Sequence, residues 1–236
     1  MSNLKVYNGF CIVPTTTYTA AGLDFYIPNI KVSTPEEFNM VVDAFKASYK
    51  RPVPEVIDAV SLNLNALYPE FVSDSMVLNV SLLYLSIEND DKFNDSLSEF
   101  SKVGFFFDDL CFDKDGNPGV VVRPGDYLFV NSGLKLGLEP GTAGIFFNKS
   151  GKGTKGWDVR ACVVDEDYAG YVHLSMTYDK RNAGNTVVYC GDKMTQMVVL
   201  PVIHPTIEVV SEDEHSSYHA NSKRGTAGFG SSDVKH

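Results

Sequence analysis

The fold is decided by residues 120–147, which read VVVRPGDYLFVNSGLKLGLEPGTAGIFF. Short runs of β-branched and aromatic residues alternate here with turn signals such as Pro124-Gly125 and Pro140-Gly141. Such runs favour strands, and Pro and Gly favour the tight turns between them. The same texture continues through Ala183-Gly184-Asn185 and Cys190-Gly191-Asp192. Regularly spaced short strands of this kind indicate a β-barrel or a β-sandwich.

Changes of texture divide the 236 residues into zones. Residues 1–30 and 119–210 are strand-rich and are predicted to form one β core. Residues 31–118 are predicted to be an inserted, partly helical subdomain that packs outside this core. Residues 211–236 are polar and rich in Gly and Ser, so composition alone predicts a disordered end.

The helices of the insertion have local signals of their own. Thr34 is predicted to be the N-cap of a helix that runs to about Tyr49, with Pro35 at its first position and Glu37 closing a capping box. A second helix is predicted from Pro54. The remaining segments are Met76 to Ile87, which fits either a strand or a buried helix, Asn94 to Lys102, which is weakly helical, and Asp113 to Pro118, which is a turn.

The bulk composition disfavours several classes of protein. The formal net charge is −10 at pH 7, whereas proteins that bind a nucleic-acid backbone carry clustered Lys and Arg. No apolar run approaches the ~18 residues that a membrane span requires, and the first residues lack the pattern of a signal peptide. We therefore expect a cytoplasmic protein without a nucleic-acid or membrane partner. The four cysteines are far apart and are expected to be reduced.

Residues 150–154, Ser-Gly-Lys-Gly-Thr, look like the end of a phosphate-binding P-loop. That motif needs a glycine five residues before Gly151, where this chain has Phe146. It must also open a helix, whereas Trp157 to Val164 is predicted to be a strand. A nucleotide-kinase function is therefore not expected.

Five other segments offer acids in tight turns, cations, hydroxyls and open backbone amides. In chain order they are AGLDF (21–25), KSG (149–151), VVDEDYAG (163–170), GDKMTQM (191–197) and KRGTAGFGSS (223–232). Together they resemble the five ordered motifs of the trimeric dUTP pyrophosphatase (dUTPase) family. The resemblance covers residues of about 11 to 30 and 119 to 236. The chain departs from the family pattern in the long insertion between the first two motifs.

The resemblance implies an all-β fold, a distorted jelly-roll or β-barrel of the dUTPase type with the insertion added to it. It implies hydrolysis of dUTP to dUMP and pyrophosphate, with Mg²⁺ as cofactor. It also implies a homotrimer whose active sites are shared, because each site in this family takes its motifs from three subunits. Residues 211–236 would then be a flexible lid that orders over bound nucleotide.

The resemblance also assigns roles in this hydrolysis, which needs an activated water and charge neutralisation on the triphosphate. Asp165 is the expected general base, and Tyr168 is expected to lie against the deoxyribose, leaving no room for a 2′-hydroxyl. Asp24 is expected to orient waters around Mg²⁺, because this ion keeps much of its hydration. Arg224 is expected to act catalytically on the γ-phosphate side. The other expected substrate-binding residues are Lys149, Ser150, Gly151, Val164, Gln196, Phe229, Gly230 and Ser231.

Three alternatives stand beside plain dUTP hydrolysis. The dCTP deaminases share this fold, but their deaminating glutamate falls on Ser175, which cannot shuttle a proton. Arg160 and Cys162 are atypical beside the base, which leaves open a bifunctional or altered-base pyrimidine dNTP hydrolase. The third alternative is a dUTPase scaffold whose insertion docks a protein partner.

Overall fold

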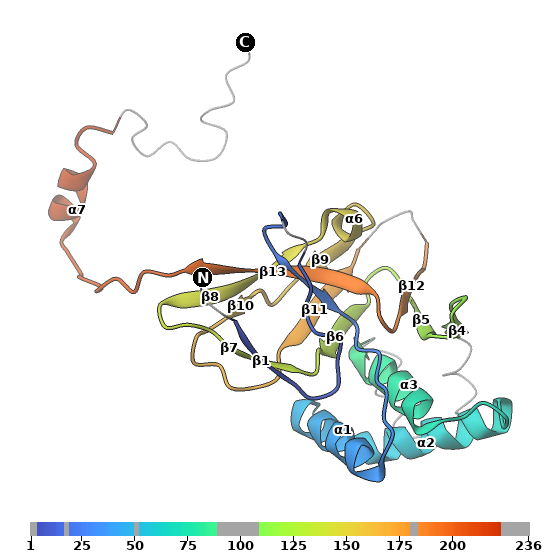
Figure 1. Cartoon of the computed structure of the whole chain (residues 1–236). Helices are drawn as coiled ribbons and strands as arrows, with labels where there is room; N and C mark the ends of the chain where they lie inside the picture. Colours follow the sequence, from blue (N-terminus) through green and yellow to red (C-terminus); the bar gives the residue numbers. More distant parts are fainter. Residues whose placement is uncertain (1–3, 17–18, 50–51, 89–108, 180–183, 223–236) are drawn as a thin grey trace. The chain divides into compact units, whose positions relative to one another are not determined.

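The computed structural model describes residues 4–16, 19–49, 52–88, 109–179 and 184–222. The chain divides into two compact units, Met1–Val202 and Ile203–His236. The sheets and the three long helices all belong to the first unit (Figure 1). Among the helices that the structure describes, none combines the length and the apolar character needed to cross a membrane.

Antiparallel strands form the sheets of the first unit, as the sequence predicts. Two four-stranded sheets have the orders β10-β8-β13-β2 and β3-β6-β11-β9, and they are accompanied by the pair β1-β7 and the triplet β12-β5-β4. The strands are β1 Lys5–Asn8, β2 Leu23–Tyr26, β3 Ile87–Glu88, β4 Leu110–Phe112, β5 Pro118–Val122, β6 Tyr127–Asn131, β7 Leu134–Gly137, β8 Thr142–Asn148, β9 Trp157–Val159, β10 Val163–Val164, β11 His173–Tyr178, β12 Thr186–Tyr189 and β13 Lys193–Pro201.

The turn signals of residues 120–147 lie between consecutive strands of the structure. Gly133, between β6 and β7, has a φ of +74°, a conformation that residues with a side chain rarely adopt. A Cβ on Gly133 would also lie 2.9 Å from the Cβ of Cys11. A glycine is therefore required here both for the turn and for the close approach of the N-terminal segment.

The longest pairing joins β8 to β13. It runs over seven residue pairs, from Thr142–Pro201 to Asn148–Thr195. On its outer sides, β13 pairs with β2 and β8 pairs with β10. Residues of this pair such as Phe146 and Met197 are buried in the core. The apolar alternation of the two strands therefore fixes the register on which the site depends.

Helix α1, Pro35–Ser48, begins as the sequence predicts. Thr34 is its N-cap, and the Thr34 hydroxyl accepts a hydrogen bond from the Glu37 amide at 3.2 Å. The Glu37 carboxylate reaches back to the Ser33 amide at 2.6 Å, one residue earlier than a standard capping box. The first turn of the helix is thus stabilised by both side chains.

The other segments of the insertion resolve as follows. Helix α2 is Val53–Leu67, close to its predicted start, and α3 is Asp74–Ser86, so the ambiguous segment is mainly a buried helix. The turn at Asp113 is confirmed, because its carboxylate accepts the amides of Asp115 and Asn117 at 2.9 and 2.8 Å. The predicted weak helix at Asn94 to Lys102 lies outside the described residues.

The helices and the strands share one hydrophobic core. The core cluster contains Phe45 of α1, Leu64 of α2 and Leu82 of α3 together with strand residues such as Leu128 and Met176. The insertion therefore does not pack outside the β core as we expected, because its apolar helix faces cover the sheets directly. The division of the chain at residues 30 and 118 stays a prediction.

A buried amide joins α3 to the segment that follows β2. Asn79 is 4% exposed, and its Oδ1 accepts a hydrogen bond from the Ile30 amide at 2.7 Å. Its Nδ2 donates to the carbonyl oxygens of Ile30 and Ser75, both at 2.9 Å. The side chain thus satisfies both backbone groups of Ile30, which would otherwise be buried without a partner.

The C-terminal part of the chain differs in two ways from what the sequence composition predicts. The last described strand, β13, ends at Pro201 rather than near Val210. Composition predicts disorder over residues 211–236, yet they include α7, Glu212–Tyr218. Its N-cap Ser211 accepts from the Glu214 amide at 3.2 Å. The capping pattern Ser-x-x-Glu was present in the sequence and was the missed signal.

The Asn79 contact generates a test of the shared core. We expect Asn79→Ala to lower the free energy of unfolding by about 3 kcal/mol, because two buried backbone groups of Ile30 lose their partner. Chemical denaturation measures this loss. The matched control is Asn65→Ala on α2, which removes an exposed amide and should change stability by less than about 0.5 kcal/mol. Equal stabilities of the two variants would contradict the role of Asn79.

Candidate active site

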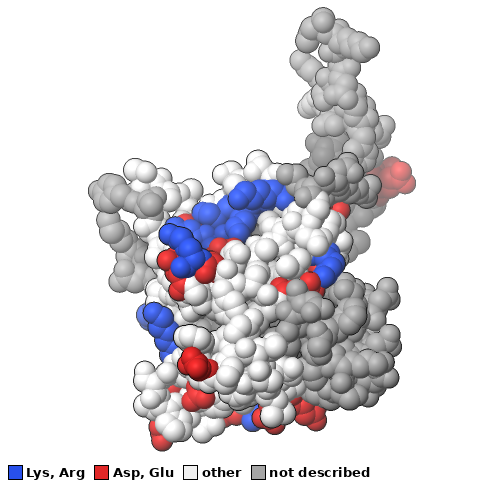
Figure 2. Space-filling model, turned by 90° about the vertical axis from the view of Figure 1, so that its right-hand side faces the viewer, with Lys and Arg blue, Asp and Glu red and all other residues white. Residues whose placement is uncertain are grey.

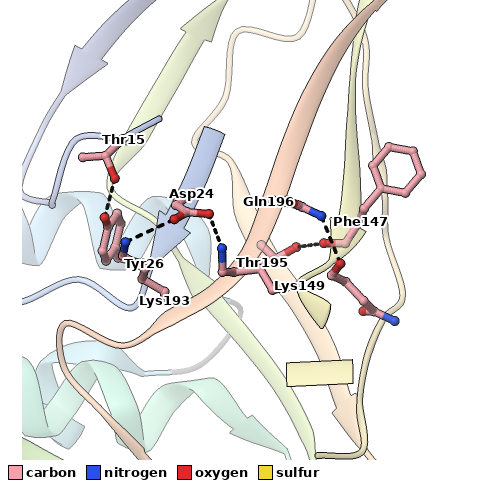
Figure 3. Close-up of polar contacts among 9 residues, drawn as sticks. Thr15, Asp24, Tyr26, Phe147, Lys149, Lys193, Thr195 and Gln196 are labelled. Atoms are coloured by element: carbon pink, nitrogen blue, oxygen red, sulfur yellow. Dashed lines mark hydrogen bonds and ion pairs between the residues drawn. The ribbon is translucent and has the colours of Figure 1, made fainter. Parts of the chain in front are cut away.

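Asp24 of β2 lies at the centre of a group of cations. Its carboxylate forms ion pairs with the Nζ atoms of Lys149 and Lys193, the latter at 3.2 Å (Figure 3). Partial burial disfavours ionisation, but the two lysines outweigh it and hold the pKa of Asp24 below its usual range. Asp24 is therefore ionised, and it fixes both ammonium groups at one end of the sheet.

Gln196 of β13 belongs to the same group. It is directly opposite Asp24 in the β2–β13 register, and its Nε2 donates to the Asn148 carbonyl at 3.2 Å. Gly22, just before β2, lets the chain lie close to β13, because a Cβ there would be only 3.1 Å from the Met197 carbonyl oxygen. Three segments far apart in the sequence thus meet here, as expected for a common site.

Lys149, Ser150 and Gly151 follow directly after β8. Lys149 is the N-cap of α6, Ser150–Gly153, which is a single helical turn. Ser150 and Gly151 are exposed, and, apart from the chain neighbours of Gly151 and the backbone of its own helical turn, no described atom lies within 4 Å of the position that a Gly151 Cβ would occupy. This one-turn helix is followed by a strand, β9, so the segment is not a P-loop. Its open backbone leaves room for an anion.

Asp165 and Tyr168 lie in the turn after β10. Val164, the last residue of β10, is buried, whereas Asp165 is exposed and its carbonyl accepts the Tyr168 amide at 3.2 Å. The Tyr168 side chain is 44% exposed, and its hydroxyl donates to the Tyr171 carbonyl at 2.9 Å. The neighbouring Glu166 accepts the Gly141 amide, which ties this acidic turn to the start of β8.

The sheet register separates these two groups within one chain. Val164 pairs with Gly144, and the direction of β10 carries Asp165 toward Ala143. Lys149 is five residues beyond Gly144, or about 17 Å along an extended strand. Asp24 lies on β2, at the opposite edge of the same four-stranded sheet from β10. The structure therefore brings Asp24, Lys149 and Gln196 together but does not bring Asp165 or Tyr168 to them.

Lys193 is a site residue that the sequence did not single out. It opens β13 in the segment already selected for Gln196, and its charge two residues after the Gly191 turn was the available signal. The neighbouring Asp192 instead pairs with Lys152 of α6 at 3.1 Å. On the face shown in Figure 2, Lys and Arg side chains gather in one region, with acidic side chains among them.

The hairpin expected to face the base is also ordered by side chains. The Arg160 Nε donates to the Thr177 hydroxyl at 2.8 Å, and its guanidinium lies 3.8 Å from the Asp158 carboxylate. Cys162 is exposed. Ser175, at the position of the deaminase glutamate, is 2% exposed and its hydroxyl is 2.7 Å from that of Tyr127. This position therefore has no carboxylate for deamination.

The expected tail residues lie outside the described residues. They are Arg224, Phe229, Gly230 and Ser231.

Comparisons with known proteins identify the family of this chain. The family model described as dUTPase matches residues 108–233, slightly more than half of the chain. The deoxyuridine 5′-triphosphate nucleotidohydrolase of Burkholderia thailandensis is 32% identical over 150 residues, 60% of this chain and 92% of that protein. The enzyme of the same name from Hahella chejuensis is 32% identical over 120 residues, which are 49% of this chain and 74% of that one.

A solved structure has a similar fold. The dUTPase of Staphylococcus bacteriophage 80alpha, in a mutant form with dUpNHpp, matches 99% of this chain and 100% of that one. The TM-score is 0.53 at 13% sequence identity, so the similarity concerns the fold alone. With the family model and the two bacterial relatives, it leads to one conclusion: the chain belongs to the dUTPase family.

Proposed function

We propose that this protein hydrolyses dUTP to dUMP and pyrophosphate, through attack of a water molecule on the α-phosphorus. Its membership of the dUTPase family supports the reaction. The observation that carries the proposal is the group at Asp24, where three separate segments meet: Asp24 itself, Lys149, and Lys193 with Gln196. Residues 1–107 lie outside the match to the family model. The ion pairs of Asp24 with Lys149 and Lys193 therefore link this residue to the matched part of the chain.

Asp165 is the proposed general base. Its carboxylate is exposed at a turn that is fixed on both sides, by the Tyr168 amide and by the Glu166 contact with Gly141. An exposed carboxylate on a rigid turn can hold a water in line with the α-phosphorus and accept its proton. The buried Val164 places the backbone of this turn, and Tyr168 faces the deoxyribose.

Cations and open amides bind the triphosphate in this proposal. Lys149 and Lys193 supply positive charge, and Ser150 and Gly151 supply a hydroxyl and an open backbone. Gln196 contacts the phosphate side. Lysine acts as a point charge rather than a planar fork, so Asp24 has to orient both ammonium groups.

The described residues fit Mg²⁺ only as a hydrated ion that accompanies the nucleotide. Both oxygens of Asp24 face lysines, and no cluster of three or more His, Cys, Asp or Glu in the described part of the chain could hold a metal. Asp24 would therefore contact the ion through water, as Mg²⁺ keeps much of its hydration. When bound, the ion would neutralise charge on the phosphate oxygens.

The register supports the proposal of a homotrimer with shared sites. The five residues from Gly144, beside β10, to Lys149 span about 17 Å, which is too far for Asp165 and Lys149 of one chain to contact the same phosphate group. In this proposal a second copy supplies one half of each site. A ring closed by a head-to-tail interface meets this requirement. The lid role of residues 211–236 and a cytoplasmic location stay predictions, as does a protein partner of the insertion.

A second candidate is an altered-base or bifunctional pyrimidine dNTP hydrolase. The observation that favours it is Arg160, which Thr177 and Asp158 hold in the hairpin expected to face the base. Pyrophosphate release from dUTP, dCTP, dTTP and UTP separates the two candidates. Release from dUTP alone supports the main proposal, whereas comparable release from dCTP or dTTP supports the second. No release from any nucleotide would contradict both.

The role of Asp165 can be tested by removing its basicity without changing its shape. We expect Asp165→Asn to lower kcat by roughly 10² to 10⁴, the usual effect of losing a general base. Binding of a non-hydrolysable dUTP analogue should remain. The control is Asp167→Asn, an exposed carboxylate in the same turn, which should keep near-normal turnover. Normal turnover of Asp165→Asn would remove this residue from the mechanism.

Shared sites can be tested by mixing two inactive proteins. Asp165→Asn damages one half of the site and Lys149→Ala damages the other. Random mixed trimers should recover about a quarter of wild-type activity, because each half is intact in about half of the sites. Pyrophosphate release after refolding the mixture measures the recovery. A mixture no more active than its components would show that each site lies within one chain.

The proposed lid can be tested by removing residues 223–236. We expect catalysis to fall far more than thermal stability, because the described core strands end at Pro201. Arg224→Ala should cause much of the same loss in kcat, since its charge would reach the γ-phosphate side. Lys235→Ala, near the other end of the removed segment, is the control cation. Equal activity of the truncated and full-length proteins would mean that the tail is only a linker.

A further inference from the structure

The Tyr168 ring is held in one place although it is half-exposed. Its hydroxyl donates to the Tyr171 carbonyl at 2.9 Å. Its ring lies against Gly170, where an added Cβ would come within 2.5 Å of the Tyr168 hydroxyl oxygen. An exposed tyrosine without such contacts would move among several rotamers. The glycine and the carbonyl together select one of them.

The Tyr171 carbonyl has a second donor, His173. The Nδ1 of His173 is 2.9 Å from the same oxygen, and because a carbonyl only accepts, Nδ1 carries the proton. Burial lowers the pKa of His173 below its usual range, so the ring is neutral. Its Nε2 is buried and has no hydrogen-bond partner among the residues that the structure describes. The orientation of this ring is therefore set by one hydrogen bond and by packing.

The packing of His173 comes from β6 and from the end of α1. The imidazole stacks on Phe129, with ring centroids 4.5 Å apart and an interplanar angle of 7°. The ring of Tyr49, the C-cap residue of α1, meets it edge-on at 6.2 Å. His173 is thus enclosed by one strand residue and one residue of the insertion.

Hydrogen bonds fasten the end of α1 to the same place. The Tyr49 hydroxyl accepts the Asn131 amide at 3.0 Å and donates to the Phe129 carbonyl at 3.3 Å. The Asn131 side chain in turn donates to the Ser48 hydroxyl. Asn131 is the residue opposite His173 in the β6–β11 register. The last turn of α1 is therefore bound to the strand that pairs with the His173 strand.

A parallel route leads from α1 to the Tyr171 ring. Phe45 of α1 meets Phe10 edge-on at 5.7 Å, and Phe10 is 6.1 Å from the Tyr171 ring. The residue that anchors Tyr168 is therefore supported by the insertion in two ways, at its carbonyl through His173 and at its ring through Phe10.

We infer that the inserted helix α1 sets the sugar selectivity of the enzyme, with His173 as a positioning residue that holds the Tyr171 carbonyl under the Tyr168 hydroxyl. This inference rests on the proposed role of Tyr168 against the deoxyribose. A gate that excludes one hydroxyl works only if its ring cannot move aside. Loosening the anchor should therefore weaken the discrimination between dUTP and UTP.

The test compares kcat/KM for dUTP and UTP in variants of the anchor. Tyr168→Phe removes the hydroxyl and keeps the ring, and Gly170→Ala displaces the ring within a surface turn. We expect each to lower the dUTP/UTP ratio roughly threefold to tenfold, the factor supplied by one hydrogen bond of ordinary strength. In Gly170→Ala the change should come from a gain with UTP. A structural defect would instead lower both values together.

His173 is tested by a matched pair of variants. His173→Leu and His173→Asn both remove the ring and are alike in shape, but only Asn offers an amide donor near the position of Nδ1. We expect the dUTP/UTP ratio to fall in His173→Leu and to recover in His173→Asn. If His173→Leu does not fold, Tyr168→Phe and Gly170→Ala still decide the role of the anchor, because both lie in a turn outside the core.

The contribution of α1 is tested at Tyr49. Tyr49→Leu removes the ring that meets His173 and should lower the dUTP/UTP ratio of kcat/KM. Tyr49→Phe keeps that ring, and its ratio should stay closer to the wild-type value. A normal ratio in Tyr49→Leu, with a lowered ratio in Tyr168→Phe, would overturn the role of the helix.

Tyr168→Ala distinguishes a failure of the positioning inference from a failure of the proposed sugar-facing role of Tyr168. If Tyr168→Ala lowers the ratio but the anchor variants do not, the positioning inference is wrong and the sugar-facing role of Tyr168 stands. If Tyr168→Ala itself leaves the ratio unchanged, the proposed role of Tyr168 is wrong.

Discussion

The pairing of β8 with β13 is the constraint on which the site depends. Its seven residue pairs fix where each strand begins and ends. At one end, β8 leads into Lys149 and β13 carries Gln196, with Asp24 added from β2. Near the other end, β8 pairs with β10, which leads into Asp165. A slip of one residue would turn every side chain of these strands to the opposite face.

Electrostatics at the proposed phosphate-binding end of the sheet follow from this geometry. Two ammonium groups next to each other repel, and Asp24 between Lys149 and Lys193 offsets that repulsion. The two lysines in turn keep the carboxylate ionised despite its partial burial. A triphosphate arriving here would find both cations already oriented. The cost of ordering two flexible lysine side chains is thus met when the protein folds rather than when it binds.

The predicted insertion is part of the scaffold rather than an appendage. Its helices complete the hydrophobic core, and its buried polar side chains end on backbone groups of the β structure, as Asn79 does at Ile30 and Tyr49 at Asn131. Buried polar contacts of this kind specify one arrangement, because any other would leave a donor or acceptor unpaired. The contacts of Tyr49 lead from α1 through His173 to the turn that carries Tyr168.

Local signals in the sequence determined the elements and the chemistry of this protein. The alternation of apolar residues with Pro-Gly turns specified the strands, Thr34 and Glu37 specified the start of α1, and five short segments specified the family. These features act between residues that are neighbours along the chain, so they can be read without a structure. The helix at Glu212 was missed only because its Ser211 cap was outweighed by the composition around it.

Only the tertiary structure decided which of these residues meet. Lys193 joined the site and the insertion joined the core through contacts between segments that no sequence spacing relates. The register of β8 likewise separated Asp165 from Lys149, although both belong to motifs that the sequence groups in one site. Such contacts depend on strand register and side-chain packing summed over the whole core. The sequence alone therefore determined the chemical character of each residue, and the fold decided which residues it contacts.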